Sequence, residues 1–222
     1  DLVEQQRRDL EKRADAEKVN QFRQQAISVL AEPKTRRAFE VEKADPKLQA
    51  RYGKNKFGLS LLMAYRLVEA GVNLVQVNLG KNSSWDTHYG NFVNLKNNLL
   101  PHADRGISAL LDDLSQSGLI EDTLVIVTGE FGRTPKINKN AGRDHWPHCY
   151  SSVLAGGGVR GGEIYGKSDN HAAYVDEKGV TPDDFGATVF HAFGIPPETP
   201  IHDQQNRPIP VSRGKPVRDL FG

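Results

Sequence analysis

The chain has 222 residues, of which 37% are hydrophobic and 26% charged, and its formal net charge at pH 7 is +1. This composition is typical of a globular protein with one sizeable core. Lysines and arginines alternate with acidic residues and form no basic stripe, which argues against a nucleic-acid partner. The longest apolar runs are far shorter than the roughly 20 residues of a membrane-spanning helix, which argues against a membrane span.

The cysteine count and the first residue of the chain add two further observations. Cys149 is the only cysteine, so a metal would have to be held by His, Asp and Glu side chains. The chain begins at Asp1 with neither an initiator Met nor a signal peptide. We therefore expect a processed product or a shortened chain.

The first predicted elements are helices. Residues 1–30 are dense in charges of both signs and carry apolar residues at spacings of three and four, which predicts a long amphipathic helix separate from the domain formed by residues 31–222. A second helical pattern covers 57–71 and ends at Gly71, a suitable C-terminal cap. The β-branched run 72–78, "VNLVQVN", then predicts a buried strand.

The same order of helix and strand follows once more. Ile107, Leu110, Leu111 and Leu114 mark one helix face that ends at Gly118. The run "TLVIVT" at 123–128 predicts the next buried strand. Two successive helix-to-strand units predict an α/β fold, with a mostly parallel sheet flanked by helices.

The last third of the chain predicts one more strand and one more helix. Residues 151–166 read as a third strand that runs into a glycine-rich ribbon or turn. Asp183 or Asp184 is expected to cap a helix through 185–193 that ends at Gly194. The Pro-rich remainder is predicted to be a tail.

Polar side chains follow two of the predicted strands. Asp86 and His88 come after the run 72–78, and Glu130 and Arg133 come after 123–128. Ligands of parallel α/β sheets bind outside the carboxyl ends of the strands. Each residue also has a structural explanation: a turn-forming aspartate, a surface histidine, an acid at the start of a turn, or an ion-pair partner.

The segment 141–150, "AGRDHWPHCY", is harder to explain by structure alone. It places Asp144, His145 and His148 beside two aromatic residues. Such a concentration of ionisable groups is not needed for solubility and is typical of functional sites. Together with the two preceding loops, it predicts a metal site. Four other histidines are assigned to solvation or a helix end: His102, His171, His191 and His202.

A second motif offers a different function. Gly161–Ser168, "GGEIYGKS", matches the phosphate-loop pattern GxxxxGK[ST] literally. That loop binds phosphate only when a helix follows at once. The segment after Ser168 lacks a helical apolar period, so a glycine-rich β-ribbon is the preferred interpretation, with nucleotide binding as the less favoured alternative.

Five spaced motifs together resemble one family. The chain is similar to the C-terminal part of the DUF1501 family, which is placed in the alkaline phosphatase and sulfatase superfamily, from about Arg36 to its end. The resemblance implies an α/β/α core with metal ions at one sheet edge. The motifs are "WDTHYGNF", "LLPHADRGISALLDDL", "TLVIVTGEFGRTPKIN", "GRDHWPH" and "LAGGGVRGG".

The resemblance also implies roles for particular residues. In that superfamily an Asp and a His a few residues apart hold one metal with a later His, a set that Asp86, His88 and His145 match. Glu130 stands where those enzymes present an Asp-His pair, and the next residue is Phe131. The strand that brings the nucleophile has no counterpart before residue 30, so the chain resembles a truncated member.

The leading hypothesis is a metal-dependent hydrolase of phosphate or sulfate esters. Its cofactor would be a divalent metal (Zn, Mn, Ca or Mg), and its substrate an anionic ester such as a sulfated or phosphorylated carbohydrate. Asp144 and Glu130 would orient the ligands or add to them, and Arg133 would hold substrate oxygens. The alternative is a non-catalytic, metal-stabilised binding module. Export to the periplasm or the outside is an expectation from the resemblance only.

Overall fold

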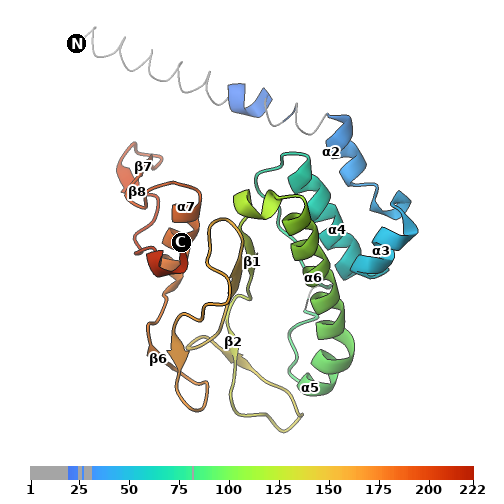
Figure 1. Cartoon of the computed structure of the whole chain (residues 1–222). Helices are drawn as coiled ribbons and strands as arrows, with labels where there is room; N and C mark the ends of the chain where they lie inside the picture. Colours follow the sequence, from blue (N-terminus) through green and yellow to red (C-terminus); the bar gives the residue numbers. More distant parts are fainter. Residues whose placement is uncertain (1–19, 25–26, 28–31, 82) are drawn as a thin grey trace, which may run out of the picture. The chain divides into compact units, whose positions relative to one another are not determined.

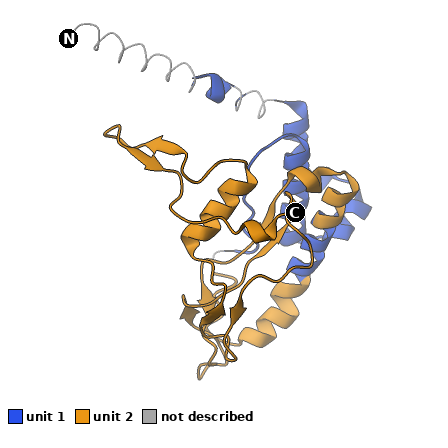
Figure 2. Cartoon of the chain, turned by 60° about the vertical axis from the view of Figure 1, so that its left-hand side comes forward, with its two compact units in different colours: residues 1–81, 102–110 blue, residues 82–101, 111–222 orange. Residues whose placement is uncertain are grey.

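The structure is a computed structural model that describes residues 20–24, 27, 32–81 and 83–222. These residues form two compact units, and each is considered by itself (Figure 2). Unit 1 comprises the described residues up to Lys81 together with His102–Leu110, and unit 2 comprises residues 83–101 and 111–222.

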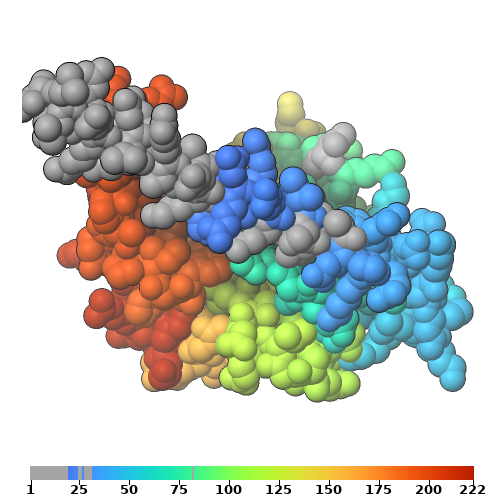
Figure 3. Space-filling view, turned by 90° about the horizontal axis from the view of Figure 1, so that it is seen from above, coloured from blue at the N-terminus to red at the C-terminus, as the bar shows by residue number. Residues whose placement is uncertain are grey.

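Unit 1 is helical. Its elements before Lys81 are α2 (Pro33–Ala38), the 3₁₀ turn η1 (Val41–Lys43), α3 (Pro46–Tyr52) and α4 (Lys56–Glu69) (Figure 1). Thr35 and Ala38 are buried, and the other side chains of α2 lie at the surface, in the blue part of Figure 3.

Local signals start and stop these helices. The Asp45 carboxylate accepts a hydrogen bond from Lys47 N at 2.8 Å, and the Asn55 side chain accepts one from Gly58 N at 3.1 Å. Both are N-terminal caps that satisfy an otherwise unpaired backbone donor. Gly71 follows α4 with φ of +90°, as expected of a residue that ends a helix.

A longer helical segment runs through residues 91–116. It consists of α5 (Asn91–Asn94), the π-helical turn η2 (Leu95–Leu99) and α6 (Leu100–Gln116). Pro101 lacks the N–H that would bond the carbonyl of residue 97, and the wider π turn lies where that bond is missing. Leu110 and Leu114 of α6 are buried, which confirms the predicted helix and its apolar face.

The predicted helix after residue 181 is confirmed as α7 (Pro182–Ala192). Its cap differs from the prediction. Thr181 is the N-cap: its hydroxyl accepts a hydrogen bond from Asp184 N at 3.1 Å, while the Asp184 carboxylate accepts one from Thr181 N at 3.2 Å. This reciprocal pair is a capping box, so Asp184 completes the cap from the third helical position. The remaining short turns are η3 (Leu119–Asp122) and η4 (Arg218–Leu220).

All strand pairs among the described residues are antiparallel and two-stranded. They are β1 (Val125–Val127) with β4 (Val153–Ala155), β2 (Gly132–Arg133) with β3 (His145–Trp146), β5 (Lys167–Ser168) with β6 (Val175–Glu177), and β7 (Pro200–His202) with β8 (Pro208–Pro210).

The predicted parallel sheet flanked by helices is therefore wrong. The apolar runs 123–128 and 151–166 do contain strands, but β1 and β4 pair antiparallel with each other. The run 72–78 joins no strand ladder in the described residues, and Leu74 is 81% exposed. An apolar, β-branched run indicates extended backbone, but it does not say which segment pairs with it or in which direction.

The N-terminal prediction can be compared with only a few residues. The amphipathic helix expected over 1–30 falls outside the described residues except for 20–24 and 27, which are helical, and no longer helix is described there. No helix among the residues that the structure describes has the length and apolar character needed to cross a membrane.

Candidate metal centre

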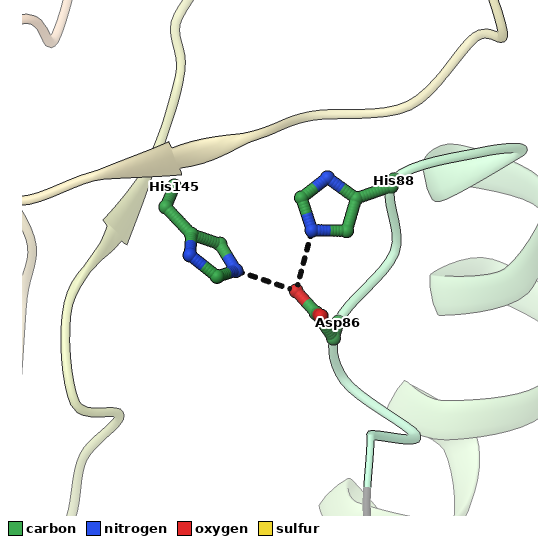
Figure 4. Close-up of side chains that lie close together, drawn as sticks. All are labelled: Asp86, His88 and His145. Atoms are coloured by element: carbon green, nitrogen blue, oxygen red, sulfur yellow. Dashed lines mark hydrogen bonds and ion pairs between the residues drawn. The ribbon is translucent and has the colours of Figure 1, made fainter.

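Three potential metal ligands meet in unit 2. Asp86 Oδ1 lies 3.0 Å from His88 Nε2 and 2.8 Å from His145 Nε2 (Figure 4). One ligand atom from each residue lies within 4.8 Å of the other two. Asp86 and His88 come from one loop and His145 from strand β3, and all three side chains point toward the same point in space.

The loop that carries Asp86 and His88 is fixed by a buried residue between them. Thr87 is 4% exposed, and its hydroxyl donates a hydrogen bond to Asn91 Oδ1 at the start of α5; Asn91 itself is 2% exposed. Thr87 O also accepts a hydrogen bond from Arg143 N at 3.1 Å. The buried threonine therefore anchors the backbone while its two neighbours face the cluster.

His145 is positioned by the β2–β3 pair. Arg133 and His145 are directly opposite each other across the two strands, so their side chains lie on the same face. Thr134 N donates to Asp144 O at 2.8 Å, and Asp144 N donates to Thr134 Oγ1 at 3.0 Å, which continues the ladder beyond β2. The antiparallel pairing thus delivers Arg133 and His145 to the cluster together.

Asp144 holds His88 from the other side of its ring. His88 Nδ1 lies 2.6 Å from Asp144 Oδ1, while its Nε2 faces Asp86. Metal-binding histidines generally donate their second ring N–H to a carboxylate, which fixes the tautomer and the ring orientation. Asp144 was predicted as a metal ligand or an orienting residue, and the structure shows the contact of an orienting residue.

The Arg133 guanidinium donates from Nη1 to Asp86 Oδ1 and lies over the Phe131 ring, with Cζ 5.6 Å from the ring centroid. The hydrogen bond from Arg133, followed by that from His145, lowers the pKa of Asp86 to about 2. The hydrogen bond from His88, with a smaller contribution from Asn138, lowers the pKa of Asp144. Both carboxylates are therefore ionised at neutral pH, the form that binds cations.

Two of the residues that the sequence singled out are not in this cluster. Glu130 is exposed and does not belong to the described group of potential ligands. His148 packs instead against Trp146 and Tyr174, with ring centroids 4.8 and 5.2 Å away. His148 therefore contributes ring contacts to this aromatic group and not a ligand atom to the cluster.

The phosphate-loop pattern lacks the structure that its chemistry requires. Ser168 ends β5 and is followed by a turn and β6, with no helix before α7. Lys167 Nζ lies 2.8 Å from Glu177 Oε1 and 3.4 Å from Asp176 Oδ2. The lysine that would contact a phosphate is thus paired with carboxylates, in agreement with the predicted glycine-rich β-ribbon.

Sequence reasoning missed one residue that contacts two members of the site. Asn138 donates from Nδ2 to His88 O at 3.0 Å and to Asp144 Oδ1 at 3.1 Å. A local signal was present, because Asn138 opens the turn "NKNAG", and asparagine side chains commonly bond backbone N–H groups in such turns. Its contact with residue 88 is not visible in the sequence.

A family model described as "Protein of unknown function (DUF1501)" matches residues 1–221. The chain belongs to the DUF1501 family. The match covers nearly the whole chain, so the family resemblance inferred from the five motifs is confirmed and extends over the N-terminal residues as well. No curated protein matches the chain, and no solved structure does.

In this DUF1501 chain, the cluster has one carboxylate oxygen and two imidazole nitrogens that could hold a metal ion. Three protein ligands are typical of catalytic rather than structural zinc sites, because they leave coordination positions for water or substrate. A carboxylate with two imidazoles is also the ligand set of many transition-metal enzymes. The described geometry fits a divalent metal with open positions.

Proposed function

We propose that the chain forms the metal centre of a hydrolase that acts on phosphate or sulfate esters. The observation that carries the proposal is the convergence of Asp86, His88 and His145 beside the Arg133 guanidinium. A metal bound there would act as a Lewis acid: it would polarise an ester oxygen and stabilise the attacking or leaving oxygen.

The ligand set favours some metals over others. Two imidazole nitrogens suit Zn and other transition metals better than Ca or Mg, which prefer sites made of oxygen ligands only. Zn and Mn are therefore the first metals to test. Asp144 supports the site by holding the His88 ring at Nδ1.

The position of Arg133 supports the proposal that the substrate is an anion. Its side chain is 18% exposed and lies against Asp86, so a bound cation would share its immediate surroundings with a guanidinium. The positive charges of a divalent cation and Arg133 together exceed the negative charges of Asp86 and Asp144, and the excess favours an anion. The planar guanidinium matches the paired oxygens of a phosphate or sulfate group, free or attached to a carbohydrate.

The first test is metal content, measured by plasma mass spectrometry on protein purified without chelators or metal-affinity resins. About one equivalent of metal is expected in the wild type, as in three-ligand sites generally, and none in the double variant His88→Ala/His145→Ala. The matched control is His171→Ala/His202→Ala, which removes two exposed histidines outside the cluster. Equal metal content in both double variants would overturn the metal centre.

The second test is hydrolysis of aryl phosphate and aryl sulfate by the metal-loaded full-length protein, which also carries the nucleophile region. Activity is expected in the wild type and the control double variant, and its loss in His88→Ala/His145→Ala. Arg133→Lys keeps the charge but removes the planar fork, so it should weaken substrate binding more than metal binding. Stoichiometric metal with no hydrolysis of either ester would overturn the hydrolase and leave the non-catalytic binding module.

A further inference from the structure

We infer that Asn138 is the positioning residue of the metal centre: its side chain fixes Asp144 and the loop of His88 in one arrangement. The inference goes beyond the proposed hydrolase but rests on its metal centre for the affinity readout. Asn138 was not among the residues that the sequence pointed to, and both ends of its amide are hydrogen-bonded to partners other than the three candidate ligand atoms.

The Asn138 amide uses its full hydrogen-bonding capacity. Nδ2 donates to His88 O at 3.0 Å and to Asp144 Oδ1 at 3.1 Å. Oδ1 accepts from Asn140 N and from Gly142 N, both at 2.9 Å. The two acceptors and two backbone donors determine which end of the amide is which, because a reversed amide would face every partner with the wrong group.

The two ends of the amide have separate tasks. The Oδ1 end closes the turn 138–142, where Asn138 N also donates to Gly142 O at 2.9 Å. The Nδ2 end connects that turn to the two parts of the metal centre, the backbone at His88 and the Asp144 carboxylate. The Oδ1 end therefore stabilises a local turn, and the Nδ2 end holds two groups of the metal centre in place.

The contact with Asp144 controls the orientation of His88. Asp144 Oδ1 accepts from both His88 Nδ1 and Asn138 Nδ2, so the amide restricts rotation of the carboxylate that holds the imidazole. With the proton on Nδ1, the Nε2 lone pair faces the point where the three ligands meet. Asn138 thus sets the tautomer and direction of one metal ligand through a second residue.

The substitution Asn138→Asp separates the two tasks. The new carboxylate has the same shape and still accepts from Asn140 N and Gly142 N, so the turn should persist. Its other oxygen would face His88 O and Asp144 Oδ1 without a proton to donate, so the positioning contacts become repulsive. Removal of such supporting groups typically weakens metal binding about 10-fold to 100-fold, and we expect a loss in this range.

The matched control is Asn140→Asp, which introduces the same charge two residues away. Asn140 is exposed and joins the network through its backbone N–H and C=O. A negative charge acting only through electrostatic attraction would strengthen cation binding in both variants. A loss of affinity in Asn138→Asp alone therefore reports positioning.

Two measurements test the inference. Calorimetric titration with Zn or Mn gives the affinity, and long-range ¹H–¹⁵N NMR of the metal-free chain reports whether His88 carries its proton on Nδ1. Asn138→Asp should lower the affinity at least about 10-fold and reduce the Nδ1–H population, while Asn140→Asp should not lower the affinity and should leave the tautomer unchanged. Thermal unfolding of both variants shows whether the turn persists.

Two results would overturn the inference. One is wild-type affinity and wild-type His88 tautomer in Asn138→Asp. The other is an unchanged tautomer with an affinity loss that merely follows the unfolded fraction, which would assign Asn138 to the turn alone. If the wild type binds no metal, the proposed function fails, and the His88 tautomer still decides the role of Asn138.

Discussion

The substitution Gly142→Ala tests whether the two segments that meet at the proposed metal centre touch as described. Gly142 is buried, and a Cβ atom at this position would lie 1.9 Å from His88 O, 2.0 Å from His88 C and 2.4 Å from Tyr89 N. All three are backbone atoms, so no side-chain rotation can make room. His88 O would have to move about 1.5 Å to reach the shortest ordinary contact of 3.4 Å.

Such a movement exceeds what the site tolerates. Functional constellations must be held to within about 0.5 Å of their productive geometry, so a shift of this size removes His88 from the ligand set. We expect metal affinity to fall by at least about 100-fold, beyond the usual effect of losing a supporting group. Overpacking of this kind also costs about 1–3 kcal/mol of unfolding free energy.

The assay combines urea unfolding with calorimetric metal titration. Gly161→Ala is the matched control, because nothing lies within 4 Å of a Cβ at that position and its φ is not positive. The control should keep wild-type affinity and stability. Wild-type metal affinity in Gly142→Ala would refute the close approach of residue 142 to the His88 backbone, and with it the argument that this contact places the ligand.

Two further predictions concern α7. Gly186→Ala should stabilise the chain by about 0.5–1 kcal/mol in urea unfolding, because a Cβ there meets nothing within 4 Å and alanine loses less backbone entropy in a helix; a loss of stability would contradict this. Hydrogen bonds from Lys215 N and then from the Thr181 hydroxyl lower the pKa of Asp184. Because the folded pKa is below the unfolded one, the wild type should have its full advantage over Asp184→Asn above about pH 4 and lose it as the pH falls further. A difference in unfolding free energy that is the same at pH 3 and pH 6 would contradict this assignment.

The helices could be predicted from the sequence because their signals are local. The pattern 57–71 corresponds to α4, Leu110 and Leu114 are buried on α6, and residues 185–193 lie largely in α7. Each helical hydrogen bond joins residues four apart, so apolar spacing and caps within one short segment describe the element. The correction at α7, where Thr181 is the cap, lies within the usual uncertainty of a boundary.

The sheets could not be predicted in the same way. The run 123–128 contains β1, but its partner β4 comes only after the β2–β3 pair and runs antiparallel. A strand's hydrogen bonds leave the segment, so its partner and direction depend on where the rest of the chain folds. The parallel arrangement was assigned by analogy with repeated helix-to-strand units, and that analogy was wrong here.

The sequence by itself determined the helices and the residue types of the candidate site: an aspartate and two histidines as candidate ligands, and an arginine for an anionic substrate. Only the tertiary structure decided which of the candidates meet. His88 and Asp144 are 56 residues apart, and Asp86 and His145 are 59 residues apart, yet both pairs are in contact. Glu130 and His148 satisfied the same sequence criteria and do not join them. The physical reason is that the proposed site depends on distances between side chains, which follow from the antiparallel pairing of β2 and β3 and from contacts such as those of the Asn138 amide.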